Sequence, residues 1–353
     1  MANRKEQELR KLQEKLQKHH GVKHVIMANQ IELLDVVPTG VLALDYALGI
    51  GGWPMGYATG LYGEPDVGKS SVLGLSAIAN AQRLGHNCAI VLVERKFDPV
   101  WAAKLGVNPN DLLLVNPSDG RKAWDAFQEI IESRAVDFVI IDSLGAMQTE
   151  SEQGLDGTHN QVGGQSKLHT WGIKRAAPVL YDNKVGAILI NQVRDVMSMR
   201  GGQEQPGGWG VKHAEPITVQ LRYKSGAGTT YKIGSGDNEV TIGRQLVAVV
   251  KMNQLAEGTG QRAVFSFYSK EVEGYPFGID WLSDVIDTAV RLKVIELAGS
   301  YYSTPDGFRA QGRNAIVQHI QDNPKLVDEI RNGALAVMRA TATKPKLEVV
   351  GDK

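Results

Sequence analysis

The residues with the clearest chemical signature form the segment 63–71, which reads GEPDVGKSS. It fits the pattern G-x-x-x-x-G-K-[ST], in which the glycines let successive backbone N–H groups turn toward phosphate oxygens. The ammonium group of Lys69 is expected to contact the β- and γ-phosphates, and the hydroxyl group of Ser70 to hold Mg²⁺. A chance match in a glycine-rich turn is the alternative, but the flanks predict a strand at 59–62 and a helix at 72–85. The pattern therefore predicts a nucleoside triphosphate site made by Gly63, Glu64, Pro65, Asp66, Val67, Gly68, Lys69, Ser70 and Ser71.

Three polar residues end or follow apolar runs typical of buried strands. Asp142 closes FVIID and is predicted to join the Mg²⁺ shell, with a helix N-cap as the alternative. Glu94 follows CAIVLV and is predicted to orient the attacking water, although a solvated salt bridge explains it equally well. Gln192 follows GAILIN, where its amide is predicted to bind the γ-phosphate and signal its loss to the next loop. Lys69, Glu94 and Gln192 are thus the predicted catalytic residues.

The elements that must position these residues alternate between strands and helices. Such alternation predicts an α/β fold with a central, mostly parallel sheet and helices on both faces. The apolar runs are interpreted as buried parallel strands, and the amphipathic segments as helices. The predicted strands are 88–93, 138–142, 186–191 and 245–250, and the predicted helices between the first of them are 99–106 and 121–134.

Two polar, glycine-rich segments, 145–166 and 195–211, directly follow predicted strands. In an open parallel sheet, loops at the carboxyl ends of strands form the ligand-binding face. Loops this long are uncommon unless they are functional or disordered. We interpret both as functional loops that order on binding.

The two ends of the chain differ in character from its centre. Residues 3–20 predict a helix with a narrow stripe of leucines, followed by a short strand at 23–29, and this stripe docks either on its own core or on a neighbouring subunit. The C-terminal part predicts a helix over 279–299, a hairpin at 300–312 and two helices divided near Pro324. The predicted domains are an N-terminal helix and strand segment at 1–33, a core with the triphosphate site at 34–270, an α+β domain at 271–340 and a flexible tail at 341–353.

The composition narrows the class of protein. The 353 residues contain 39 Lys and Arg and 39 Asp and Glu, so nucleic-acid binding would need a local basic patch. The single cysteine, Cys88, lies in an apolar run and is expected to be buried, which suits a reducing compartment. The sequence contains no secretory signal and no apolar stretch of about 18 residues, so a cytoplasmic protein is expected.

Together these motifs resemble the bacterial RecA recombinase family over residues 21–335. TGVLALDYALGIGGWPMG resembles the segment before the phosphate-binding loop, and VDFVIIDSLGAM resembles the family's Walker B strand. AIVLVERKFDPVWAAKLGV is similar to the stretch that carries the catalytic glutamate, here Glu94. By resemblance, Asp98 and Trp101 in that stretch would contact adenine.

The resemblance implies the P-loop NTPase fold with a docking N-terminal segment, and it implies ATP and Mg²⁺ as cofactors. It also implies helical filaments on single-stranded DNA that search duplex DNA and exchange strands in recombination and repair. The segments 145–166 and 195–211 would be the DNA-binding loops. Methionines would wedge between bases, and cations and backbone amides would hold phosphates. The DNA-binding candidates are Arg194, Met197, Met199, Gly207, Gly208 and Lys212. A LexA-like repressor is a further partner that the resemblance suggests.

Several residues depart from the family pattern and indicate a divergent member, compatible with a phage origin. The family has two basic residues, two positions apart, that reach ATP across the subunit interface; Lys251 matches the first, but Asn253 replaces the second. His213 replaces an aromatic residue after Lys212, and Asn160 and Gln165 stand where the family tends to have Met and Arg. The family's acidic tail is also missing.

Two other functions fit part of this sequence. A hexameric helicase would share the phosphate-binding loop and the acidic residues, but the N-terminal docking helix and Lys251 argue against it. A DNA-binding filament or mediator that uses nucleotide as a switch without hydrolysing it is compatible with Asn253.

Overall fold

The computed structural model describes residues 2–21, 25–27, 34–147, 164–195, 203–204 and 214–342. Two units are separated at Asp35, and the first contains the helix α1 (Ala2–His20), as the sequence predicted. Leu9 and Leu12 of α1 are about half exposed, at 47% and 50%. The strand predicted at 23–29 falls largely outside the described residues, and 25–27 are not in a strand. The docking of this leucine stripe, on its own core or on a neighbouring subunit, stays a prediction.

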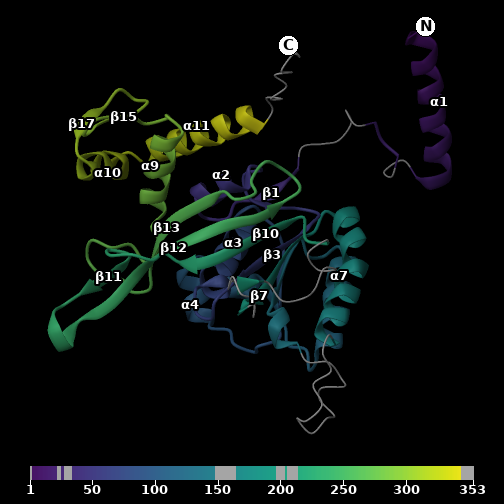
Figure 1. Cartoon of the computed structure of the whole chain (residues 1–353), viewed down its shortest axis with the longest axis horizontal. Coiled ribbons are helices and arrows are strands. Elements are labelled where there is room, and N and C mark those ends of the chain that lie inside the picture. The colour runs from purple at the N-terminus through teal and green to yellow at the C-terminus, as the bar shows by residue number, and fades with distance from the viewer. Residues whose placement is uncertain are drawn as a thin grey trace. The chain divides into compact units, whose positions relative to one another are not determined.

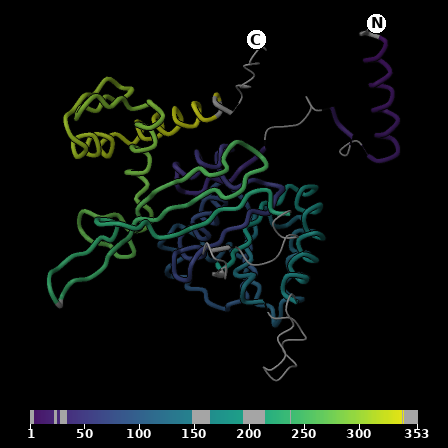
Figure 2. Tube along the Cα trace, viewed as in Figure 1, coloured from purple at the N-terminus to yellow at the C-terminus, as the bar shows by residue number. Residues whose placement is uncertain are grey.

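The second unit is built around a sheet of ten strands, which Figure 1 shows beneath the label α2 and Figure 2 as adjacent traces. Its central strands are parallel, as predicted, because helices connect most of them. Along the sheet the order is β14 (Gly278–Ile279), β13 (Arg262–Tyr268), β12 (Val240–Asn253), β10 (Ile217–Tyr223), β3 (Ala58–Gly63), β7 (Gly186–Gln192), β6 (Phe138–Asp142), β4 (Cys88–Leu92) and β5 (Leu112–Val115), with β11 (Thr230–Ile233) paired to β12.

One strand prediction was wrong in direction. The apolar run 245–250 lies in β12, which pairs antiparallel with both β10 and β13. The chain between β10 and β12 contains β11 and the short 3-10 helix Gly236–Asn238, and it makes a hairpin instead of a crossover. A parallel strand would have required a crossover connection of a dozen or more residues, usually a helix.

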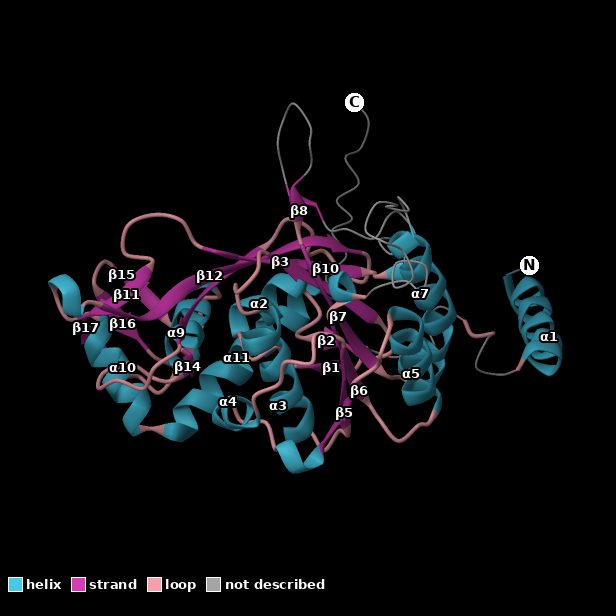
Figure 3. Ribbon diagram, turned by 90° about the horizontal axis from the view of Figure 1, so that it is seen from below, coloured by secondary structure: helices cyan, strands magenta, loops and turns pink. Residues whose placement is uncertain are grey.

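Helices cover both faces of the parallel part of the sheet (Figure 3). Neighbouring residues of one strand point to opposite faces, so Ile140 of β6 packs into one core and Ile141 into the other. The first core is closed by α2 (Leu42–Leu48), α3 (Leu75–Arg83) and α4 (Pro99–Lys104), and the second by α5 (Gly120–Glu132) and α7 (Gly164–Asn183). The buried Trp124 of α5 lies directly against Gly172 of α7.

The C-terminal part has its own apolar core. The helix predicted over 279–299 is shorter in the structure, so the predicted end was wrong. The helix α9 ends at Arg291, and Lys293 beyond it has a left-handed φ of 60°. The following residues instead form the first strand of a three-stranded antiparallel sheet. The predicted division near Pro324 is confirmed, since Pro324 opens a helix. The elements are α9 (Trp281–Arg291), β15 (Glu296–Ala298), β16 (Tyr301–Ser303), β17 (Arg309–Gln311), α10 (Arg313–Asp322) and α11 (Pro324–Ala342).

Short elements complete the described chain. They are β1 (Val36–Val37) paired with β2 (Trp53–Pro54), β8 (Arg194–Asp195) paired with β9 (Gln203–Glu204), and 3-10 turns at Pro109–Asp111 and Leu144–Ala146. None of the helices described here combines the length and apolarity needed to cross a bilayer. The predicted tail begins inside α11, and residues 343–353 lie outside the described residues.

Two carboxylates are buried near α2, and one of them joins the C-terminal part to this helix. Asp284 of α9 accepts hydrogen bonds from the backbone N–H groups of Leu42 and Ala43, and thereby caps α2, whose own N-cap residue has no capping side chain. Asp45 of α2 accepts one from the N–H of Thr39 at 2.8 Å. Burial raises the pKa of both Asp45 and Asp284 to about 7. Their charge state therefore changes near neutral pH.

Candidate nucleotide-binding site

The glycine-rich segment forms a loop between β3 and the helix that follows it. Asp66 and Gly68 have positive φ angles of 59° and 93°, which turn the backbone sharply. Gly63 allows a close approach, because a Cβ atom there would lie 2.2 Å from the carbonyl oxygen of Leu221. The helix predicted from residue 72 begins earlier and in a different form, as a π-helix over Lys69–Gly74. The N–H groups of Val72 and Leu73 both donate to the carbonyl of Gly68, which widens this first turn.

Lys69 lies inside the loop. Its side chain is largely buried, and Nζ donates hydrogen bonds to the carbonyl oxygens of Gly63 at 2.9 Å and Glu64 at 2.6 Å. Burial lowers the pKa of this ammonium group, while the carboxylates of Asp142 and Glu94 oppose that shift. These contacts hold a cation next to the loop's backbone.

Ser70 and Asp142 form the second part of the site. The hydroxyl group of Ser70 donates to Oδ1 of Asp142 at 2.9 Å, so the two predicted metal ligands are in contact. Burial raises the pKa of Asp142 to about 6, and the hydrogen bond from Ser70 opposes the shift. The N-cap alternative for Asp142 is not supported, because Ser143 occupies the N-cap of the next turn and no side chain caps it.

This donor set suits Mg²⁺. A hydroxyl and a carboxylate oxygen meet at the edge of the phosphate-binding loop, and Mg²⁺ prefers oxygen ligands shared between protein and phosphates. Among the residues that the structure describes, no cation lies within hydrogen-bonding distance of the partly buried carboxylate of Asp142, and a metal ion would compensate its charge. Ser70 and Asp142 therefore fit the ion that the loop implies.

Glu94 is held beside this pair from the neighbouring strand. Its Oε1 accepts a hydrogen bond from the hydroxyl group of Ser143 at 2.8 Å, and its Oε2 lies 3.8 Å from Nζ of Lys96. The Lys96 side chain is 83% exposed, so this ion pair is strongly screened by water. Glu94 is thus positioned at the site by Ser143, and it also forms a weak salt bridge with Lys96.

Gln192 ends β7 directly beside the start of the loop. It pairs with Gly63 in the parallel ladder of β3 and β7, and its side chain is exposed. Its N–H group donates to the side chain of Asn191 at 2.9 Å. The strand pairing therefore places Gln192 at the end of β7 beside Gly63, and the predicted contact of its amide with the γ-phosphate stays a prediction.

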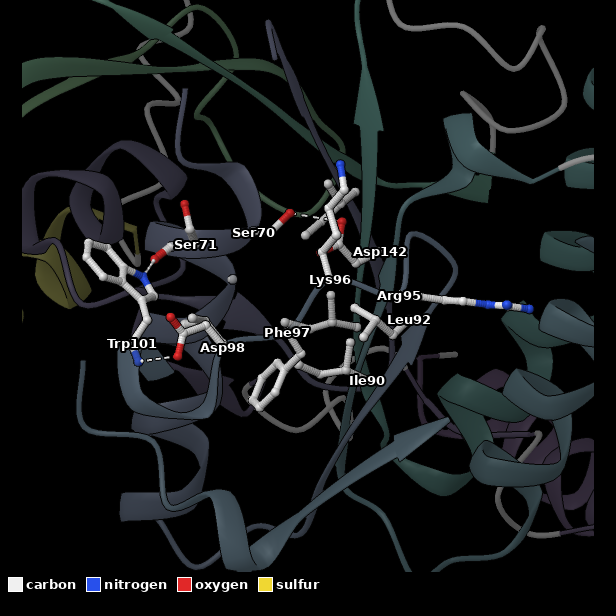
Figure 4. A pocket seen from close by; sticks show the side chains of 14 residues that line it. Ser70, Ser71, Ile90, Leu92, Arg95, Lys96, Phe97, Asp98, Trp101 and Asp142 are labelled. Atoms are coloured by element: carbon white, nitrogen blue, oxygen red, sulfur yellow. Dashed lines mark hydrogen bonds between the residues drawn. The ribbon is translucent and has the colours of Figure 1, made fainter. Parts of the chain in front are cut away.

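A cavity of about 560 Å³ opens next to Ser70 and Asp142 (Figure 4). Asp98 and Trp101, the predicted adenine contacts, line it. Asp98 caps α4 by accepting from the N–H groups of Val100 and Trp101, and the indole N–H of Trp101 donates to the carbonyl of Ser71 at 2.9 Å. The ring of Trp101 also packs against the rings of Phe267 and Phe277. The other lining residues are Gly74, Leu75, Ile90, Leu92, Arg95, Lys96, Phe97, Ile140 and Ile190.

Lys251 and Asn253 have different roles in the structure. Lys251 is exposed near the end of β12. Asn253 instead supports a turn: its side-chain oxygen accepts from the N–H groups of Leu255 and Ala256, and its amide donates to the carbonyl of Leu48 at 2.7 Å. The side chain of Asn253 is thus engaged in hydrogen bonds within this chain.

Most of the predicted DNA contacts fall outside the described residues. This applies to Met197, Met199, Gly207, Gly208 and Lys212, and also to Asn160 and His213. The backbone of Arg194 is described as part of β8. Gln165 opens α7 and donates to the carbonyl of Met147 at 3.2 Å. The DNA-binding roles of these residues stay predictions.

Sequence reasoning missed two kinds of residue at the site. Ser143, which holds Glu94, follows a predicted metal ligand, and that position was the available signal. Tyr223 donates a hydrogen bond to the carbonyl of Asp66 in the phosphate-binding loop at 2.6 Å. It lies 157 residues from Asp66 in a strand outside every motif, so the sequence offered no signal for it.

Comparisons with known proteins identify relatives over most of this chain. Residues 7–270 match the family described as RecA N-terminal domain, and residues 283–338 match RecA C-terminal domain. Protein RecA of Deinococcus radiodurans is 31% identical over 307 residues, which cover 87% of this chain and 81% of that protein. Protein RecA of Thermus thermophilus is 33% identical over 302 residues, covering 86% and 85%. Protein RecA of Bacteroides thetaiotaomicron is 30% identical over 319 residues, covering 90% and 92%.

Proposed function

Because this chain belongs to the RecA family, we propose that it is an ATP-dependent DNA recombinase. It assembles into helical filaments on single-stranded DNA, pairs the bound strand with homologous duplex DNA and exchanges strands. ATP hydrolysis is stimulated by DNA. A LexA-like repressor is a further partner in this proposal, and the protein acts in the cytoplasm.

The observation that carries the proposal is the meeting of three polar side chains beside the phosphate-binding loop. Ser70 contacts Asp142 at 2.9 Å, and Glu94 is fixed by the residue that follows Asp142. These groups come from the helix after β3 and from the carboxyl ends of β4 and β6. Ligands bind at that edge of a parallel sheet. The carboxylate of Asp142 is buried, and burial raises its pKa to about 6. A cluster of polar side chains that served only as solvated surface would not need such a buried carboxylate.

Each side chain has a proposed task in ATP hydrolysis. Lys69 leaves its two carbonyl partners to bind the phosphates, and Ser70 and Asp142 would hold Mg²⁺, which compensates the charge of the phosphates. Glu94 orients a water molecule and accepts its proton, while the hydroxyl group of Ser143 keeps the carboxylate in place. Gln192 contacts the γ-phosphate from the end of β7.

The proposal connects this chemistry to DNA through the segment after β7. Gln192 stands beside Gly63 in the sheet, and residues 195–211 begin three positions later. Loss of the γ-phosphate would remove a contact of Gln192 and shift the loop between bound and released forms. Arg194, Met197, Met199 and Lys212 would hold DNA phosphates and bases. Lys251 would reach the nucleotide of the next subunit.

The test is ATP hydrolysis with and without single-stranded DNA, with electron micrographs of the same samples. Wild-type protein is expected to hydrolyse ATP faster when DNA is added and to form filaments. Glu94→Gln should retain filaments while losing about 100-fold or more of the hydrolysis rate. Filaments with negligible turnover in the wild type would favour the nucleotide-switched filament, which the committed side chain of Asn253 leaves possible. Absence of filaments with an ATP analogue that is hydrolysed slowly would refute the recombinase.

A further inference from the structure

We propose that Tyr223 is a positioning residue for the phosphate-binding loop, and this inference rests on the proposed binding of ATP. Its hydroxyl group donates to the backbone carbonyl of Asp66 at 2.6 Å. A peptide unit is planar and trans, so its C=O and N–H groups point in opposite directions. Tyr223 thus fixes the carbonyl of Asp66 toward β10. The N–H group of Val67 is thereby turned away from β10, toward the side on which the phosphates of the proposed ATP would bind.

The strand pairing brings Tyr223 to this place. β10 runs parallel to β3, with Leu221 opposite Gly63, the first residue of the loop. Tyr223 is two residues further along, so its side chain points to the same face as Leu221 and packs on the same apolar core. β3 ends at Gly63 while β10 continues, and the ring of Tyr223 therefore runs alongside the loop.

The loop has a conformational need that this hydrogen bond meets. Asp66 has a φ of 59°, in the left-handed region that non-glycine residues adopt at a cost in free energy. The next side chain, Val67, is buried in the apolar core beside Gly63. The Asp66–Val67 peptide is therefore anchored at one end by burial of Val67 and at its carbonyl by Tyr223.

Arg244 packs over the ring of Tyr223. Its guanidinium group lies 4.7 Å from the centre of the ring, in a cation–π contact. Arg244 pairs with Thr230 at the base of the hairpin formed by β11 and β12. The hairpin is thus linked to the phosphate-binding loop through one aromatic ring.

The substitution Tyr223→Phe tests this role, because it removes the hydroxyl group and keeps the ring. ATP affinity is measured by titration calorimetry with a slowly hydrolysed analogue and Mg²⁺, beside the urea midpoint of each protein. We expect affinity to fall about five-fold, the effect of one hydrogen bond, with little change in the midpoint. Tyr231→Phe is the matched control: its hydroxyl group bonds to Ser266 of β13 and Gln245 of β12, and affinity should stay unchanged.

A second variant separates positioning from general packing. Asp66→Gly removes the conformational cost at this position, since glycine adopts a positive φ freely. In that background Tyr223→Phe should weaken ATP binding less than it does in the wild type, giving a coupling of at least about two-fold. Equal effects in both backgrounds, or unchanged affinity in Tyr223→Phe, would overturn the inference while leaving the nucleotide site intact. Failure of the wild type to bind ATP would overturn the proposed function and this inference together.

Discussion

Replacement of Lys69 by methionine would separate nucleotide binding from folding. Methionine keeps an unbranched stem of similar length and removes the ammonium group. In the structure that group donates to the carbonyls of Gly63 at 2.9 Å and Glu64 at 2.6 Å. Burial lowers the pKa of Lys69, because removing the ammonium group from water costs free energy in the folded protein.

The two effects on folding act in opposite directions. Removing the charge relieves its desolvation, while the two carbonyls lose their donor, so the free energy of unfolding should change by less than about 1 kcal/mol. Binding has no such compensation, because a charged hydrogen bond to phosphate contributes about 1.5–3 kcal/mol. The dissociation constant for ATP should therefore rise about 10- to 150-fold.

Titration calorimetry with a slowly hydrolysed ATP analogue measures the binding, and urea unfolding measures stability. Lys232→Met is a matched control, since Nζ of Lys232 pairs with a carboxylate oxygen of Glu239 at 2.7 Å in the hairpin of β11 and β12. Its ATP affinity should equal that of the wild type. An affinity of Lys69→Met within two-fold of the wild type would refute the assignment of the phosphate site, and a collapse of stability would refute the energetic argument.

Three further changes test other parts of the chain. Burial raises the pKa of Asp45 to about 7 from its usual 3.8, so its contribution to stability is complete below about pH 4 and is lost as the pH rises through 7. Wild-type unfolding free energy should fall by about 2–3 kcal/mol from this group between pH 5 and pH 8, and Asp45→Asn should show a flatter urea-unfolding profile; identical profiles would contradict this. Gly172→Ala should destabilise by about 1–3 kcal/mol in urea unfolding, because the new Cβ would lie 2.1 Å from the ring of Trp124, and an unchanged midpoint would disprove that packing. Replacing Met197 and Met199 together by alanine should weaken single-stranded DNA binding in an anisotropy titration while ATP affinity stays constant; equal DNA affinity would place the contact elsewhere.

Local patterns located the strands β3, β4, β6 and β7 and the helices α1, α3, α4 and α5, but not β5, β10, β13 or α7. The phosphate-binding loop was predictable because its chemistry is contained in residues 63–71. Period and apolarity located β4, β6 and β7 to within a residue or two, since both faces of these strands are buried. Such signals depend on neighbours in the sequence, and they hold whatever the rest of the chain does.

Other features were wrong or invisible because they depend on partners distant in the sequence. The run 245–250 is as apolar as a parallel strand, yet a hairpin makes β12 antiparallel. The helix predicted to end at Gly299 stops at Arg291, since the residues beyond it pair with another strand. Apolarity reports burial and says nothing about strand direction or pairing partner.

The sequence by itself determined that this chain has a triphosphate loop, acidic and amide side chains at strand ends, and the RecA family pattern around them. Only the tertiary structure decided which of these groups meet. It joined Ser70 to Asp142, and Glu94 to Ser143, and it committed Asn253 to a turn. It also brought Tyr223 to the loop, because β10 is the neighbour of β3 in the sheet. The physical reason is that sheet order sets these distances, and sheet order results from packing the whole chain at once.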